Sequence, residues 1–272
     1  MKHTAIHADE SNSQYWQDLW QYRELFYFFS WRDLLVRYRH ALLGITWALL
    51  TPILSTLIFT FVFHKVGKFP SYGVPYPMLV LAGLLPWQFF SNALENSSGS
   101  MLASANLISK IYFPRLIIPL SCLITSLVEF CIGAVLFVVL MAWYGIAPTW
   151  RLLALPFFFG LALVSSAGFG VWLSALTVKY RDFRYVVPFV LRLAMFASPI
   201  GYCSDVIPDK WRLVYSLNPL VQVIDGFRWS ILQGRTEVYL PGLLLSSVLM
   251  LAILLGGLWF FRHFEKNLAD II

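Results

Sequence analysis

The sequence has little charge. Only 12% of its 272 residues are Asp, Glu, Lys or Arg, whereas an ordinary soluble domain has about 25%. Hydrophobic residues make up 59% of the chain and the mean hydropathy is +0.70. This composition excludes a typical soluble domain and indicates an integral membrane protein. The net charge of +6 comes from basic residues that flank apolar segments, so we expect them to meet anionic lipid headgroups and not nucleic acid.

The sequence also lacks catalytic signatures. It contains no G-x-x-x-x-G-K-[ST] phosphate loop, no H-E-x-x-H pair and no G-x-S-x-G turn, and its five histidines are scattered. We therefore expect no enzyme activity, no bound cofactor and no metal site on this chain. The three cysteines, Cys122, Cys131 and Cys203, have no zinc-type spacing. We expect all three to pack as small hydrophobic residues.

What the sequence has is long apolar runs. A membrane-spanning helix needs about 20 apolar residues, and six segments come close to that length: 41–63, 74–95, 116–143, 152–178, 185–203 and 238–261. The sequence thus predicts an all-α membrane protein with six spans in a transmembrane domain over 41–262. Residues 1–40 and 263–272 form the two ends. Because six is even and basic residues favour the inner side by 12 to 7, both termini are predicted to be cytoplasmic.

Two regions depart from simple spans. Residues 14–39 mix Trp, Tyr and Phe with charges, which is typical of a helix lying in the membrane interface, with Trp16, Trp20 and Phe29 among the lipid-facing residues; the alternative is a packed cytosolic helix. Residues 206–234 hold an apolar stretch too short to span, punctuated by proline and glycine. We expect a re-entrant helical hairpin there; the alternative is a plain extracytoplasmic loop.

Polar residues inside spans are candidates for function. Arg192 interrupts the fifth span and shares a helical face with an aromatic stripe of Tyr185, Phe189 and Phe196, followed by Pro199. This face suits a sugar path, because aromatic rings pack on the C–H faces of pyranoses and Arg donates to hydroxyls. The alternative is helix packing, with Arg192 paired to Glu129. The first span has a comparable face, which could instead make helix–helix contacts: Trp47, Thr51, Ser55 and Phe59.

The segment 96–115 between the second and third spans begins with small polar residues and then carries an apolar ridge. We expect a short cytosolic helix that docks on a partner protein; the alternative is a connecting loop. The residues assigned to this contact are Ser100, Met101, Leu102, Asn106 and Leu107.

Four strings, in order, resemble one family. They are RYRHALLGITWALLTP (Arg37–Pro52), NLISKIYFPR (Asn106–Arg115), KYRDFRYVVPFVLRLAMFASPI (Lys179–Ile200) and SLNPL (Ser216–Leu220). Together they resemble the membrane subunit of the O-antigen and teichoic-acid exporters, in the type-2 ABC transporter superfamily. Each string alone is weak, but their order between matching spans is specific.

The resemblance implies a homodimer in the inner, cytoplasmic membrane whose two copies line a channel. Two copies of a separate ATPase subunit would bind ATP and Mg²⁺ and dock on the coupling segment, and membrane lipids would surround the dimer. The substrate would be a polysaccharide on undecaprenyl diphosphate. By position, Asn218 and Pro219 would form an outer gate. Arg37, Arg39 and His40 would receive the lipid diphosphate at the entrance, unless they only anchor the chain to headgroups.

Two other functions stay open. A type-2 ABC permease for teichoic acid, a drug or another lipid would have the same fold. A membrane enzyme that processes glycans is a remote alternative, and it would need catalytic acids among the outer ones: Asp205, Asp209, Asp225 and Glu237.

Overall fold

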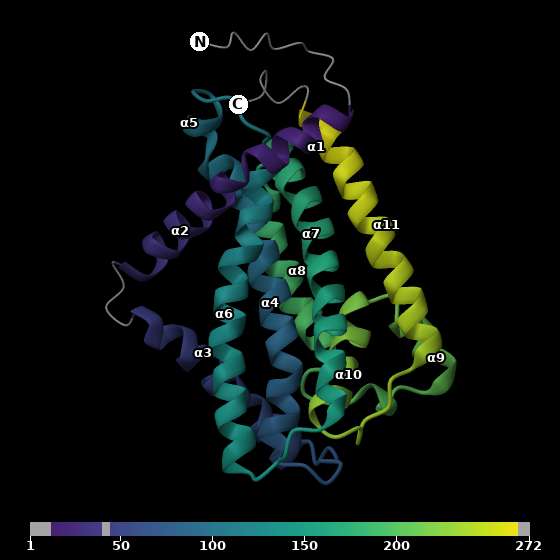
Figure 1. Cartoon of the computed structure of the whole chain (residues 1–272). Coiled ribbons are helices and arrows are strands. Elements are labelled where there is room, and N and C mark those ends of the chain that lie inside the picture. Colours follow the sequence, from purple (N-terminus) through teal and green to yellow (C-terminus); the bar gives the residue numbers. More distant parts are fainter. Residues whose placement is uncertain (1–11, 40–43, 266–272) are drawn as a thin grey trace.

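The computed structural model describes residues 12–39 and 44–265 (Figure 1). Within these ranges the chain is helical and contains no strand, so the predicted all-α class is confirmed. The elements are α1 (Asn12–Gln21), α2 (Arg23–Arg39), α3 (Gly44–Phe59), η1 (Thr60–Val66), α4 (Tyr76–Ala103), α5 (Ala105–Ile108), α6 (Ile117–Trp143), η2 (Trp150–Ala154), α7 (Leu155–Lys179), α8 (Phe183–Ala197), η3 (Ser204–Val206), α9 (Asp209–Tyr215), α10 (Pro219–Ile231) and α11 (Leu240–Glu265).

Five helices in the described part of the chain are long and apolar enough to cross a membrane: Thr46–Val66, Tyr76–Ala103, Ile117–Trp143, Trp150–Lys179 and Leu240–Glu265. The expected fifth span, 185–203, is the 15-residue helix α8. At 1.5 Å per residue it rises about 22 Å, which is less than the roughly 30 Å of a bilayer core. The count of six spans therefore stays a prediction.

Helix α4 is the centre of the bundle. Its most apolar stretch is 78% buried inside the protein, whereas those of the other four candidate spans are 17–28% buried. It packs between α6 and α7, and α11 leans on the far side of α7 (Figure 1). Gly168 of α7 allows this last contact, because a Cβ there would lie 2.8 Å from the backbone nitrogen of Leu254. Small residues allow such close helix approaches in membranes.

The N-terminal helices pack against the bundle. Phe29 of α2 is fully buried and lies 5.7 Å from the ring of Phe113, and Ser30 Oγ donates to the carbonyl of Ser121 at 3.1 Å. The prediction that Phe29 faces lipid is wrong, because α2 uses that side chain to pack beside α6. Trp16 and Trp20 are exposed, and their contact with lipid stays a prediction.

The same end of the bundle is fastened by Glu265 at the end of α11. Tyr15 Oη of α1 donates to Glu265 Oε2 at 2.8 Å, and the backbone N–H of Arg115 donates to Oε1 at 3.0 Å. Burial, reinforced by the nearby carboxylate, raises the pKa of Tyr15, so this phenol stays protonated and remains a donor. Helices α1 and α11 and the start of α6 thus form one fixed end.

The segment before α11 is packed around a buried cation. Arg228 of α10 is fully buried and donates to three carbonyls, those of Leu79 at 3.1 Å, Tyr202 at 2.6 Å and Ile200 at 2.6 Å. These bonds join α10, α4 and the turn after α8. Helix α10 is therefore part of the core, while its predicted re-entrant depth in the membrane stays a prediction.

All three cysteines are free thiols. Cys122 and Cys203 are buried, as expected for packing residues, but Cys131 is exposed on α6. The packing assignment is thus wrong for Cys131 within a single copy of the chain.

Candidate functional site

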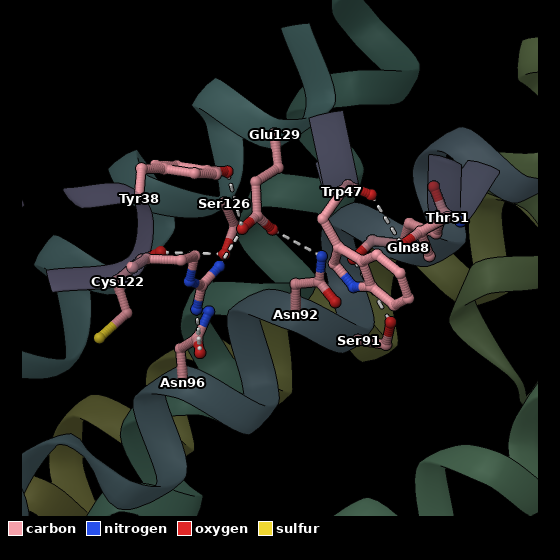
Figure 2. Close-up of polar contacts among 11 residues, drawn as sticks. Tyr38, Trp47, Thr51, Gln88, Ser91, Asn92, Asn96, Cys122, Ser126 and Glu129 are labelled. Atoms are coloured by element: carbon pink, nitrogen blue, oxygen red, sulfur yellow. Dashed lines mark hydrogen bonds and ion pairs between the residues drawn. The ribbon is translucent and has the colours of Figure 1, made fainter. Parts of the chain in front are cut away.

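A groove of about 710 Å³ with several polar side chains lies between α2 and α3 on one side and α4 and α6 on the other. Figure 2 shows its polar contacts. The lining residues are Arg37, Tyr38, Trp47, Ala48, Thr51, Pro52, Leu85, Gln88, Phe89, Asn92, Glu95, Asn96, Glu129 and Phe130. Amides, carboxylates and an arginine thus line the same groove as aromatic rings. This combination fits a ligand with both hydroxyls and apolar faces.

Glu129 of α6 is the hub of this groove (Figure 2). Its Oε1 forms an ion pair with Arg37, and its Oε2 accepts from Asn92 Nδ2 at 2.7 Å. Arg37 also donates to Asn96 Oδ1 at 2.8 Å. The Glu129 side chain is only 15% exposed, and burial of a polar group is costly unless it has hydrogen-bond partners such as these. The network joins α2, α4 and α6.

The structure shows which arginine is the partner of Glu129. Glu129 pairs with Arg37, so the suggested pairing of Arg192 with Glu129 is wrong. Arg192 instead lies on the exposed side of α8. A weak signal for Asn92 and Asn96 as partners is present in the sequence, since Gln88, Asn92 and Asn96 recur every four residues and must share a face of α4.

The four residues predicted to share a face of the first span differ in exposure. Trp47 is 58% exposed and lines the groove together with Thr51, whose Oγ1 donates to the carbonyl of Trp47 at 3.0 Å. Ser55 is half-buried. Phe59 is buried and stacks on Phe63 with ring centroids 5.5 Å apart. Within one copy of the chain, Phe59 is a packing residue, and its assignment to a channel wall is not supported by its position.

The face predicted on α8 is intact. Tyr185, Phe189 and Phe196 are 61–76% exposed and Arg192 is exposed beside them. Pro199 leaves this face, because α8 ends at Ala197 and Pro199 is buried in the turn that follows. A stripe of three aromatic rings and one cation is therefore open to whatever lies beside α8. Its role in lining a channel stays a prediction.

The proposed diphosphate cluster is not brought together in the described residues. Arg37 is held by Glu129 and Asn96. Arg39 is exposed at the end of α2. His40 lies outside the described residues. A phosphate group at Arg37 would have to compete with Glu129 for the guanidinium.

The expected coupling segment begins later than predicted. Helix α4 continues to Ala103, so Ser100, Met101 and Leu102 form its last turn and not a loop. Met101 is buried in an apolar cluster, and Ser100 Oγ donates to the carbonyl of Ser97 at 2.7 Å. The short helix α5 follows, in which Asn106 is exposed and Leu107 is half-buried. Helix α5 projects from the end of the bundle near α1 (Figure 1).

The Asn218-Pro219 pair begins α10. Asn218 Oδ1 accepts from the backbone N–H of Leu220 at 3.1 Å, and its Nδ2 donates to Ser198 Oγ at 3.0 Å. Asn is a preferred N-cap and Pro a preferred first helical residue. The pair thus has a structural role that fixes α10 to the turn after α8, and a role as an outer gate stays a prediction.

The four outer acids lie in different settings. Asp205 accepts from Tyr72 Oη at 2.7 Å, Asp225 is buried and accepts from Ser204 Oγ at 2.5 Å, and Asp209 pairs with Arg212 at 3.3 Å. Glu237 is exposed. Within the described residues, no group of three or more His, Cys, Asp or Glu side chains could hold a metal ion.

Known proteins resemble nearly the whole chain. The model of the ABC-2 type transporter family matches residues 24–232. The O-antigen export system permease protein RfbA of Klebsiella pneumoniae is 30% identical over 249 residues, covering 89% of this chain and 92% of that protein. RfbA of Myxococcus xanthus is 30% identical over 85% of this chain and 89% of its own length. The polysialic acid transport protein KpsM of Escherichia coli is 26% identical over 86% of this chain and 91% of its own length. These matches confirm the resemblance found in the four sequence strings, and the chain belongs to the ABC-2 type transporter family.

Proposed function

We propose that this chain is the membrane subunit of an ATP-driven exporter that moves a polysaccharide, O-antigen-like and linked to undecaprenyl diphosphate, across the cytoplasmic membrane. Two copies form the channel, and a separate ATPase subunit supplies the energy. One observation carries the proposal: O-antigen export permeases match this chain at 30% identity over almost their full length. The match covers 89% of this chain, so it extends beyond a shared local motif.

The architecture supports this proposal. Of the five long apolar helices in the described residues, α4 is the most buried and the other four lie around it. The sequence has no nucleotide-binding loop. A permease of this kind needs an external motor, and α5 is the element we assign to that contact. It projects from the bundle beside α1 and the end of α11 (Figure 1), which we place on the cytoplasmic side.

Two surfaces are suited to a sugar chain. The groove offers amide and carboxylate groups beside Trp47, and the face of α8 offers three rings around Arg192. Aromatic rings cover the apolar faces of sugars, and Arg donates to their hydroxyls. In a dimer these two exposed faces would line the path between the copies.

Deletion of the gene, followed by complementation, tests the proposal. We expect the deletion strain to lose its surface polysaccharide and to accumulate the lipid-linked polymer inside. A tagged copy should co-purify with an ATPase subunit, and a catalytically dead variant of that ATPase should reproduce the deletion. Normal surface glycan with altered drug or lipid export would instead support the second class of permease. Glycan processing by the purified chain without any ATPase would contradict transport altogether.

A further inference from the structure

A second cavity of about 250 Å³ lies near α9, at the end of the bundle opposite α5 (Figure 1). It is formed by η3, α9, the start of α10 and the segment that leads into α11. Its lining residues are Ser204, Asp205, Arg212, Tyr215, Ser216, Val221, Gln222, Glu237, Val238, Tyr239, Leu240 and Pro241. Pockets for drug-sized ligands hold about 300–1,000 Å³. This cavity is therefore suited to a single ring-sized group.

Charged groups of both signs line this cavity. Asp205 and Glu237 come from segments far apart in the sequence, and Arg212 is the cation between them in chain order. Asp205 uses one oxygen to accept from Tyr72 Oη at 2.7 Å and keeps the other for a ligand. The two carboxylates outnumber the single guanidinium. The lining thus disfavours an anionic ligand and accepts a neutral or a cationic one.

Two buried polar atoms of this lining have no hydrogen-bond partner among the described residues: Gln222 Oε1 and Arg212 Nε. Gln222 is only 2% exposed, and Arg212 Nε forms an ion pair with Asp209 Oδ1 at 3.3 Å but donates no hydrogen bond. Buried polar groups in native proteins almost always have partners. One of these atoms is an acceptor and the other a donor, and a ligand with several hydroxyl groups carries both functions.

The Gln222 amide is held in place by its surroundings. Its Nε2 donates to Ser216 Oγ at 3.0 Å, and Ser246 Oγ of α11 donates to the carbonyl of Ser216 at 2.7 Å. Gly242 permits this approach of α11, because a Cβ there would lie 2.7 Å from Gln222 Nε2. With its nitrogen engaged by Ser216, the side chain keeps its oxygen for another donor. The floor of the cavity is thus rigid and already oriented.

We propose that this cavity binds one neutral or amine-bearing sugar unit of the exported glycan on the outer side. The sugar's hydroxyls would donate to Asp205, Glu237 and Gln222 and accept from Arg212, while Tyr215 and Tyr239 supply aromatic surface. The proposal rests on the proposed function, because it takes its ligand class and its orientation from glycan export. It adds a selective step after the channel, in which acidic sugars are disfavoured.

Saturation-transfer NMR on the purified full complex tests this site. The probes are glucose, N-acetylglucosamine, glucosamine and glucuronate. We expect transfer to the first three and little to glucuronate. Asp205→Asn combined with Glu237→Gln should weaken the binding of the neutral sugars by about tenfold, since charged hydrogen bonds are lost. Both residues are exposed, so this variant should fold. Gln222→Met tests the buried acceptor, and Asp182→Asn, an exposed acid at the opposite end, is the matched control.

Three results would overturn the proposal. The first is unchanged sugar binding in the double variant, which would place the sugar elsewhere. The second is no transfer from any neutral sugar to the folded complex, which would leave water as the occupant of the cavity. The third is equal binding of glucuronate. All three results come from binding measurements and not from the export assay. If the complex does not bind these sugars while the strain exports glycan normally, the sugar site is refuted and the proposed function stands. Sugar binding by a chain whose deletion leaves surface glycan intact refutes the proposed function.

Discussion

The ion pair between Arg37 and Glu129 provides a direct test of how the groove is held together. Glu129→Gln keeps an oxygen that accepts from Asn92, but it removes the negative charge that faces Arg37. Arg37→Gln removes the positive charge and, because its side chain is shorter, also the bond to Asn96. Each variant should lower the free energy of unfolding, because it leaves a charge without its counter-charge in a poorly solvated groove.

The exposure of the two side chains sets the magnitude. Exposed ion pairs contribute about 0–1 kcal/mol, whereas breaking a buried pair costs about 3–5 kcal/mol. Arg37 is 35% exposed and Glu129 is 15% exposed, which lies between these limits. We therefore expect each single variant to lose about 2 kcal/mol of unfolding free energy. The double variant should lose less than the sum of the two, with a coupling of about 1–2 kcal/mol.

The assay is unfolding of the purified protein in mixed micelles by increasing the mole fraction of SDS, followed by circular dichroism. The wild type, both single variants and the double variant form one thermodynamic cycle. Glu95→Gln is a suitable control, because Glu95 lines the same groove and is exposed. If the two single losses add within about 0.5 kcal/mol, the charges do not interact in the folded protein and the network is not what joins α2 to α6.

Three further predictions concern other elements. Arg192→Ala and Phe196→Ala should each reduce export of surface glycan while the ATPase subunit still co-purifies, because both side chains lie on the exposed face of α8; normal export by both would remove the channel-face interpretation. Leu102→Asp at the end of α4 and Leu107→Asp in α5 should leave ATP hydrolysis by the partner intact but stop export, and unchanged coupling would count against docking at this end of the bundle. Arg228→Met should cost more than about 3 kcal/mol in thermal or SDS stability, because three buried carbonyls lose a charged donor; Arg228→Lys should not rescue it, since one ammonium lacks the guanidinium's reach to all three.

Apolar length and periodicity were enough to predict the class of this fold. The long runs around α4, α6, α7 and α11 could only be helices, because a backbone in lipid must satisfy its own hydrogen bonds. The four-residue spacing on α8 likewise predicted a face that the structure leaves exposed. These are local properties, and local sequence determines them.

Partners across the bundle could not be predicted in this way. Glu129 lies 92 residues from Arg37, and no periodicity within one span indicates which cation from another span will reach it. Arg228 lies within the segment predicted to form a re-entrant hairpin, yet it binds carbonyls of α4 and of the turn after α8. Phe59 continued a helical face in the sequence, but the start of α4 covers it. In each case the side chain's role depends on the arrangement of helices, which the spacing of residues does not contain.

The arrangement of α7 and α11 bears on the number of crossings. Val178, at the end of α7, packs in the same cluster as Phe261, near the end of α11. Helix α11 is 26 residues long, so its start lies about 39 Å away along its axis. Between Lys179 and Leu240 the chain must therefore return to the opposite end. Helix α8 covers most of the distance between the two ends of the bundle. The turn after α8, which is bound by Arg228, covers the rest.

Cysteine labelling tests this return directly. In a background where the three native cysteines are replaced by alanine, single cysteines are placed at Ser109 near α5, at Arg181 before α8 and at Asp209 in α9, all exposed positions. A membrane-impermeant maleimide on intact cells should label only position 209, and permeabilised cells should show all three. Labelling of 181 and 209 from the same side would mean that α8 does not complete a crossing. Five crossings would then place α5 and the end of α11 on opposite sides, which contradicts the bonds that Glu265 makes to Tyr15 and Arg115 at the α5 end. We therefore predict that α8 crosses the membrane together with its turn, and we expect the bilayer or a second copy of the chain to accommodate the shortfall in its length.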